Sequence, residues 1–144
     1  LATCTVWLAI DDSTPDNGCL KFIKGSHIDQ KLKSHNINNK KNITLNQELA
    51  NEEFDETKAV NLVLERGQIS LHDVYLVHGS EANNSPNARR AMTMRFMPTS
   101  SIFDHQLVKD KNLFSKLNVN KYSDRKIYHM RGKDISTKNN LTFS

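Results

Sequence analysis

The sequence predicts a mainly β protein, built as an antiparallel sandwich or barrel. Three observations support this class: short apolar runs recur along the chain, turn-forming residues separate them at regular intervals, and few segments show the period of an amphipathic helix. A doubly wound α/β fold would need a long helical crossover between successive strands. The pattern therefore favours antiparallel pairing over βαβ winding.

The first strand is expected at Thr5 to Ile10, where residues typical of strands follow one another. Asn17-Gly18 predicts a tight turn, because these two residue types tolerate positive φ angles. A second strand is expected over 19–23, and Gly25-Ser26 ends it.

Residues 28–58 have a different composition and are interpreted as a polar insertion. Asparagine and lysine are frequent there and large apolar residues are few, which favours a surface loop with some helix over 45–57. The alternative is a lid over a site, since long loops in compact domains are often functional.

Further strands are expected over 59–64, 69–77 and 89–96, with a possible strand at 126–130 and a weak helix signal at 113–117. Side chains in the third of these strands alternate between two faces. One face holds Arg89, Ala91, Thr93 and Arg95, and the other holds Arg90, Met92, Met94 and Phe96.

Composition excludes several classes of protein. Twenty basic and sixteen acidic residues leave a net charge of only +4, without the basic stripe and interleaved aromatics of a nucleic-acid binder. No apolar run approaches the roughly 20 residues of a membrane span. Two cysteines are too few for a disulfide framework, which favours a reducing compartment, the cytoplasm. The length predicts a single domain over 1–144, and the strand almost at the first residue predicts the C-terminal part of a longer protein.

Two histidines and an arginine are the main candidates for chemistry. His72 and His78 lie six residues apart on one expected strand and so share a face, with His78 at the strand end. A hairpin to the next strand would bring Arg89 near His78, where it could hold a carboxylate through two parallel hydrogen bonds. Ser80 could add a hydroxyl group, and the alternative for Arg89 is a surface position beside Arg90.

A second pattern suggests a metal site. His27-Ile28-Asp29 has the spacing that supplies two ligands of a 2-His-1-carboxylate face, with His78 as a third, and that face is typical of non-haem Fe(II). From spacing alone this interpretation stays open.

Several segments in order resemble the phytanoyl-CoA dioxygenase family over residues 3–100. They are Trp7-Leu8-Ala9-Ile10-Asp11-Asp12, Asp16-Asn17-Gly18-Cys19-Leu20, Ile23-Lys24-Gly25-Ser26-His27, Arg66-Gly67-Gln68-Ile69-Ser70-Leu71-His72, and His78-Gly79-Ser80 with Asn83 and Arg89. The resemblance implies a double-stranded β-helix, the cupin-like jelly roll, incomplete at its N-terminus. It also implies Fe(II) with 2-oxoglutarate as co-substrate and O₂ as oxidant.

The resemblance also implies roles for single residues. His78 corresponds to the distal histidine that binds iron, Arg89 to the arginine that binds the 2-oxoglutarate carboxylate, and Ser80 to the serine that assists it. Trp7 corresponds to a tryptophan near the co-substrate. The family's His-x-Asp pair lies upstream of the Trp7 strand, and His27 corresponds to the histidine of a Gly-Ser-His turn.

By resemblance, the parent protein is expected to be a 2-oxoglutarate-dependent dioxygenase that hydroxylates a small molecule. This chain would supply one of the three metal ligands and be inactive alone. A non-haem iron halogenase of the same fold and a non-catalytic jelly-roll binding module are the alternatives.

Overall fold

The computed structural model describes residues 3–38, 47–105 and 125–142, and strands dominate its regular structure. The strands are β1 (Cys4–Ala9), β2 (Leu20–Ile23), β3 (His35–Ile37), β4 (Gln47–Leu49), β5 (Ala59–Asn61), β6 (Ile69–Asp73), β7 (His78–Ser80), β8 (Ala91–Phe96), β9 (Ile127–Tyr128) and β10 (Leu141–Thr142). Three single-turn 3₁₀ helices occur at Pro15–Asn17 (η1), Asn51–Glu53 (η2) and Glu56–Lys58 (η3). The predicted mainly β class is confirmed.

The chain divides into two compact units. The first holds residues 1–33 and 51–97, and the second holds residues 34–50 and 98–144. The polar insertion predicted at 28–58 is therefore shared, since its central part belongs to the second unit. Every candidate site residue lies in the first unit.

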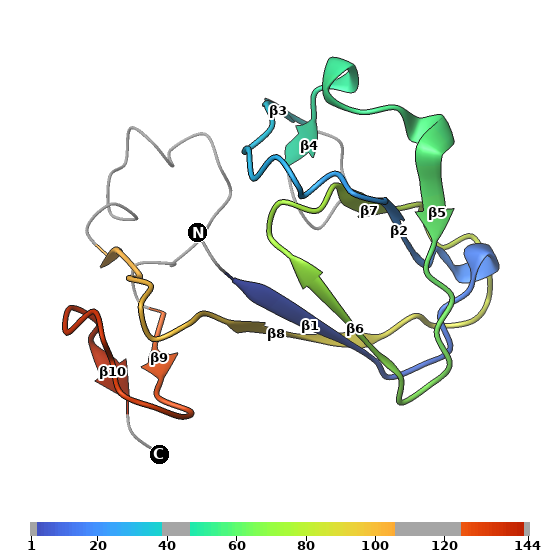
Figure 1. Ribbon diagram of the computed structural model, residues 1–144. Helices are drawn as coiled ribbons and strands as arrows, with labels where there is room; N and C mark the ends of the chain where they lie inside the picture. Colours follow the sequence, from blue (N-terminus) through green and yellow to red (C-terminus); the bar gives the residue numbers. More distant parts are fainter. Residues whose placement is uncertain (1–2, 39–46, 106–124, 143–144) are drawn as a thin grey trace. The chain divides into compact units, whose positions relative to one another are not determined.

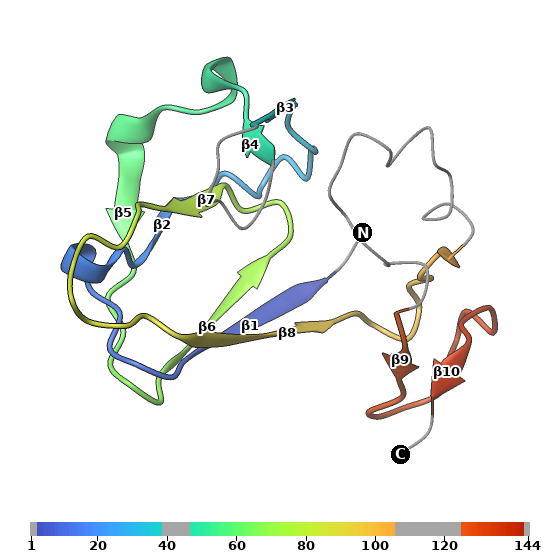
Figure 2. The same cartoon turned by 180° about the vertical axis from the view of Figure 1, so that it is seen from behind.

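Two three-stranded antiparallel sheets form the first unit, with strand orders β6-β1-β8 and β5-β2-β7. Figures 1 and 2 show them as separate layers. The chain passes from one sheet to the other between β1 and β2, between β5 and β6, and at both following connections. This alternation between two facing sheets is that of the jelly roll, and it confirms the fold class.

The first of these crossings is made by the predicted Asn17-Gly18 turn. The side-chain oxygen of Asn17 accepts a hydrogen bond from the backbone N–H of Thr14 at 2.8 Å, and its amide donates to the carbonyl of Asp12 at 2.8 Å. Gly18 follows with a φ of +75°. Asn17 is buried because it satisfies the backbone of the loop that joins the two sheets.

The face of the β6-β1-β8 sheet that carries Thr5, Trp7 and Ala9 is called the inner face here. These three residues alternate along β1 and are 7%, 7% and 1% exposed. β1 is the central strand, so the pairing register places neighbours on the same face: Ser70 and His72 from β6, and Ala91, Thr93 and Arg95 from β8. The two faces predicted for residues 89–96 are thereby confirmed over Ala91–Phe96.

The opposite, outer face of this sheet is apolar. Val6 and Leu8 of β1 lie there between Ile69 and Leu71 of β6 and two methionines of β8. Ile69 is 54% exposed and Leu71 is 64% exposed.

The single strand predicted over 69–77 is wrong. β6 ends at Asp73, whose carboxylate accepts the N–H of Tyr75 at 2.7 Å and whose carbonyl accepts the N–H of Leu76 at 3.2 Å. The chain turns there and enters the other sheet as β7. The predicted hairpin between the His78 strand and the Arg89 strand is wrong for the same reason, because β7 pairs with β2 and β8 pairs with β1.

The helix predicted over 45–57 is also wrong. β4 pairs antiparallel with β3, and only the short turns η2 and η3 follow. The side chain of Asp55 accepts the N–H of Thr57, which caps η3 locally without extending it. The strand expected at 126–130 is the short β9, which pairs parallel with β10. Residues 39–46 of the insertion and the helix signal at 113–117 lie outside the described residues.

The described segments contain no helix with the length and apolarity of a membrane span.

Replacing Gly18 with alanine is expected to destabilise the first unit. A Cβ atom there would lie 2.6 Å from the backbone oxygen of Glu81, in addition to the strain of a positive φ. Gly67→Ala is the matched control, since its φ is +89° and nothing lies within 4 Å of the added carbon. Gly67→Ala should cost about 1–2 kcal/mol for the left-handed backbone alone, and Gly18→Ala should cost more in urea unfolding. Equal losses would show that the close approach at Gly18 relaxes freely.

Candidate functional site

The ring of His78 lies against the ring of His72, although the two residues belong to different sheets of the first unit. The ring centroids are 5.1 Å apart and the planes are tilted by 50°. His72 pairs with Thr5 of β1 and so lies on the inner face. His78 and Ser80 share one face of β7, since they are two residues apart, and the ring contact shows that this face meets the inner face.

The hydrogen bond of His78 fixes which ring nitrogen is available. Its Nδ1 lies 2.6 Å from the backbone carbonyl of Leu76. A carbonyl oxygen only accepts, so Nδ1 carries the proton and donates. In the neutral imidazole, Nε2 then holds the lone pair, as in a metal-binding histidine whose other nitrogen is held by a carbonyl.

The surroundings of His72 favour its neutral form. Burial lowers its pKa, and the nearby His78 and Arg95 lower it further. Its Nδ1 is buried and has no hydrogen-bond partner among the described residues.

Arg89 brings a cation to the same region, in which His78 and Ser80 are exposed. It precedes Ala91 by two residues, so its side chain follows the inner face, and its Nε is buried without a hydrogen-bond partner in the described part of the chain. Burial raises the pKa of the Cys19 thiol, and the positive charge of Arg89 opposes that rise. Cys19 precedes Leu20, the strand partner of Ser80, so Arg89 acts near the Ser80 end of β7.

Trp7 and Ser70 complete the inner face. Trp7 is buried on the central strand between its two register partners, Ser70 of β6 and Thr93 of β8. The hydroxyl oxygen of Ser70 is buried and has no hydrogen-bond partner within the described ranges. Buried polar groups are normally paired. In the described part of the chain, Ser70, His72 and Arg89 each have one buried polar atom without such a partner, as does Ser13 after β1.

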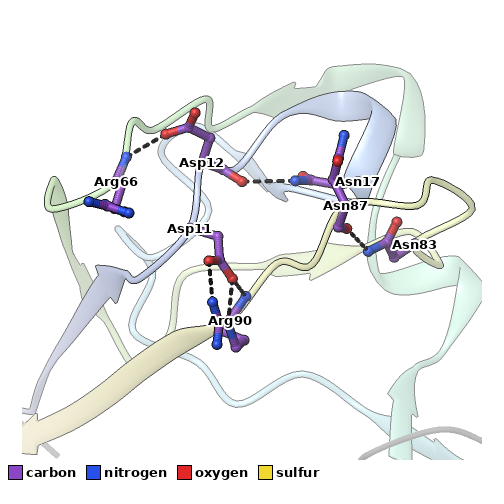
Figure 3. A network of polar contacts seen from close by, with 7 residues as sticks. All are labelled: Asp11, Asp12, Asn17, Arg66, Asn83, Asn87 and Arg90. Carbon is purple, nitrogen blue, oxygen red and sulfur yellow. Dashed lines mark hydrogen bonds and ion pairs between the residues drawn. The ribbon is translucent and has the colours of Figure 1, made fainter.

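The residue next to Arg89 is held firmly at the surface. Arg90 forms a two-pronged pair with Asp11: Nε lies 2.9 Å from Oδ2 and Nη2 lies 2.8 Å from Oδ1 (Figure 3). The backbone N–H of Arg90 also donates to Oδ2 at 2.8 Å. The neighbouring Asp12 instead accepts the backbone N–H of Arg66 at 2.7 Å.

Sequence reasoning placed Trp7 in the first strand, and β1 contains it. Arg89 lies two residues before the start of β8. His78 and Arg89 belong to facing sheets rather than to one hairpin. The alternative metal pair receives no support: the Asp29 carboxylate accepts the N–H of Lys31 at 3.2 Å and lies 3.6 Å from the Lys33 ammonium. Among the described residues, no three side chains of the metal-binding types gather at one point.

Two features escaped sequence reasoning. Ser70 was not recognised as an inner-face residue, although its two-residue spacing from His72 was a usable signal. The pairing of Asp11 with Arg90 joins residues 79 positions apart, and only the fold brings them together.

Lowering the pH should weaken the ion pair between Asp11 and Arg90 and so lower the stability of the fold. The pKa of Asp11 is lowered from 3.8 to about 2, first by the hydrogen bond from the Arg90 side chain and then by that from its backbone. A carboxylate with a lowered pKa stabilises the folded state above its unfolded pKa, and that stabilisation is lost as pH falls through the folded value. The unfolding free energy should therefore drop between about pH 4 and pH 2 more steeply in the wild type than in Asp11→Asn.

Urea titrations across this pH interval measure the difference. Asp16→Asn, which removes an acidic residue of the nearby η1 turn, serves as the charge control and should keep the wild-type slope. A wild-type slope in Asp11→Asn would contradict the pairing.

The chain is similar to curated proteins, to solved structures and to one family model. The chain is 33% identical over 99 residues to a phytanoyl-CoA dioxygenase domain-containing protein 1 homolog from Dictyostelium discoideum, covering 67% of this chain and 35% of that protein. Curated relatives of this kind are about three times as long as the part matched here, so the chain spans about a third of their length.

Solved structures agree on the fold. The apo form of the non-heme monooxygenase ThoJ matches with a TM-score of 0.56 and 26% identity, over 68% of this chain and 34% of that one. EvdO2 from Micromonospora carbonacea var. aurantiaca, complexed with 2-oxoglutarate, matches with a TM-score of 0.55 at 24% identity, over 65% of this chain and 37% of that one. The second likeness concerns the fold alone.

The family model described as phytanoyl-CoA dioxygenase matches residues 2–91. That range contains the inner-face strand β1, the His72–His78 contact and Arg89 with its buried Nε. The chain therefore belongs to the phytanoyl-CoA dioxygenase family.

Proposed function

We propose that the whole protein is an Fe(II)- and 2-oxoglutarate-dependent dioxygenase that hydroxylates a small molecule. The 144 residues would form the C-terminal part of one jelly-roll oxygenase domain, with 28–58 as a polar insertion. The observation that supports this most directly is Arg89, a guanidinium with a buried, unpartnered Nε on the inner face of a family member. A cytoplasmic location is proposed from the two cysteines, both free thiols.

His78 fits the role of an iron ligand. His78 offers Nε2 with its lone pair, because Nδ1 donates to the carbonyl of Leu76. A histidine binds a metal as the neutral imidazole, so affinity should fall as acid protonates it. The remaining two ligands are proposed to be a His-x-Asp pair outside these 144 residues, and His27 is assigned no role at the metal.

The residues also fit the co-substrate. A guanidinium binds a carboxylate through two parallel hydrogen bonds, and the buried Nε of Arg89 has its donor to spare. Ser80 is proposed to donate its hydroxyl to the same far carboxylate, and Trp7 to form an apolar wall that keeps water out. Bound iron and 2-oxoglutarate would supply the oxidation of a C–H bond by O₂, while the protein holds and orients them.

Arg89→Ala is expected to weaken 2-oxoglutarate binding strongly and leave Fe(II) binding in place. A carboxylate deprived of a buried charged partner typically loses about 2–5 kcal/mol, which is roughly 30-fold or more in affinity. Equilibrium dialysis of 2-oxoglutarate with the whole protein and Mn(II), a redox-silent substitute for iron, measures this. Arg66→Ala, on the exposed turn before β6, is the control. Unchanged affinity in Arg89→Ala would refute the assignment.

His78→Ala is expected to have the reverse effect of Arg89→Ala, because it removes a proposed iron ligand. Fe(II) binding should be lost first. His27→Ala is its matched control, because His27 belongs to the alternative metal pattern and is exposed. Metal content after anaerobic loading with Fe(II) should fall in His78→Ala and stay at the wild-type value in His27→Ala. Loss of iron in His27→Ala instead would favour the pair with Asp29.

A further inference from the structure

Arg89 and Arg90 are adjacent but occupy opposite environments. The Arg90 side chain is 71% exposed, whereas the Nε of Arg89 is buried. Neighbouring residues on extended backbone point to opposite faces. The direction of Arg89 therefore depends on how the backbone is held at Arg90.

The strand ladder does not reach Arg89. The last register pair between β1 and β8 is Ala9 with Ala91, and Arg89 lies two residues before it. Beyond that pair, the backbone N–H groups of Ile10 and Asp11 both donate to the carbonyl of Arg90, at 3.0 and 3.3 Å. Arg90 is thus the residue before β8 whose backbone is still hydrogen-bonded to the end of β1.

Asp11 completes this hold with its side chain. Its two carboxylate oxygens accept one backbone and two side-chain hydrogen bonds from Arg90 (Figure 3). The side-chain pair has the two-pronged geometry that fixes orientation as well as distance. Both the main chain and the side chain of Arg90 are tied to one residue at the end of β1.

A contribution to stability does not account for the whole arrangement. The side-chain pair alone could supply that contribution, but the backbone N–H of Arg90 also donates to the same carboxylate. What the contacts do fix is the backbone orientation at Arg90, and with it the face to which Arg89 turns.

We infer that Asp11 and Arg90 are positioning residues for Arg89, and that they hold its guanidinium on the inner face where the far carboxylate of 2-oxoglutarate binds. This inference rests on the proposed function for the ligand only. The orientation of the Arg89 side chain is a property of the protein without its ligands.

The matched pair of variants is Asp11→Asn and Asp12→Asn. Both remove one charge from the same loop, but Asp12 accepts the N–H of Arg66 and does not touch Arg90. In Asp11→Asn, an amide NH₂ replaces one acceptor and faces the donors of Arg90. Arg90→Lys keeps the charge and removes the planar fork, so it should behave like Asp11→Asn.

Two measurements on the whole protein test the inference, both well below the unfolding temperature of each variant. Dialysis with 2-oxoglutarate and Mn(II) should show the dissociation constant raised about tenfold in Asp11→Asn and Arg90→Lys, by analogy with outer partners of metal ligands. Mn(II) affinity should stay unchanged, and Asp12→Asn should match the wild type. In the ligand-free protein, the Nε–H resonance of Arg89 should shift in Asp11→Asn but not in Asp12→Asn.

Equal effects of Asp11→Asn and Asp12→Asn on both measurements would overturn the inference. So would a wild-type dissociation constant and an unshifted Arg89 resonance in Asp11→Asn. If Arg89→Ala leaves 2-oxoglutarate binding intact, the proposed function fails. The Arg89 resonance then still decides the positioning, because it requires no ligand.

Discussion

The pairing of β1 with β6 on one side and β8 on the other is the constraint on which the site depends. Because side chains alternate on every strand, this register decides at once which residues of three segments share the inner face. A slip of one residue on β6 would exchange His72 for Leu71 and remove the contact with His78. The polar interior is thus a property of the register rather than of any single residue.

The β6-β1-β8 sheet reverses the usual distribution of polarity. Its inner face holds Thr5, Ser70, His72 and Thr93 around one tryptophan, while its outer face holds valine, leucine, isoleucine and methionine. Buried polar groups normally have partners, so the orphaned atoms of Ser70, His72 and Arg89 fit the polar co-substrate of the proposed function.

The parts of the fold that depend on local sequence patterns could be predicted. The Asn17-Gly18 turn and the two faces of residues 89–96 follow from the conformational preferences of the residues themselves. The change of sheet after Asp73 could not be predicted, because the apolar pattern continues through it. The turn depends on the Asp73 carboxylate and on a hydrogen bond from Val77 to the hydroxyl of Ser26, which lies 51 residues away in sequence.

The same division between local and distant interactions explains the two arginines. Alternation from Ala91 directs Arg89 to the inner face and Arg90 to the outer one, but the strand ladder ends at Ala91 and does not hold either arginine. Asp11 supplies that hold: it follows the end of the central strand, and its carboxylate matches the fork of the Arg90 guanidinium. The arginine that pairs there stays outside with a satisfied charge, and its neighbour enters the interior with a donor to spare. The ion pair between Asp11 and Arg90 thus keeps Arg90 outside and leaves Arg89 as the arginine with an unpaired buried donor.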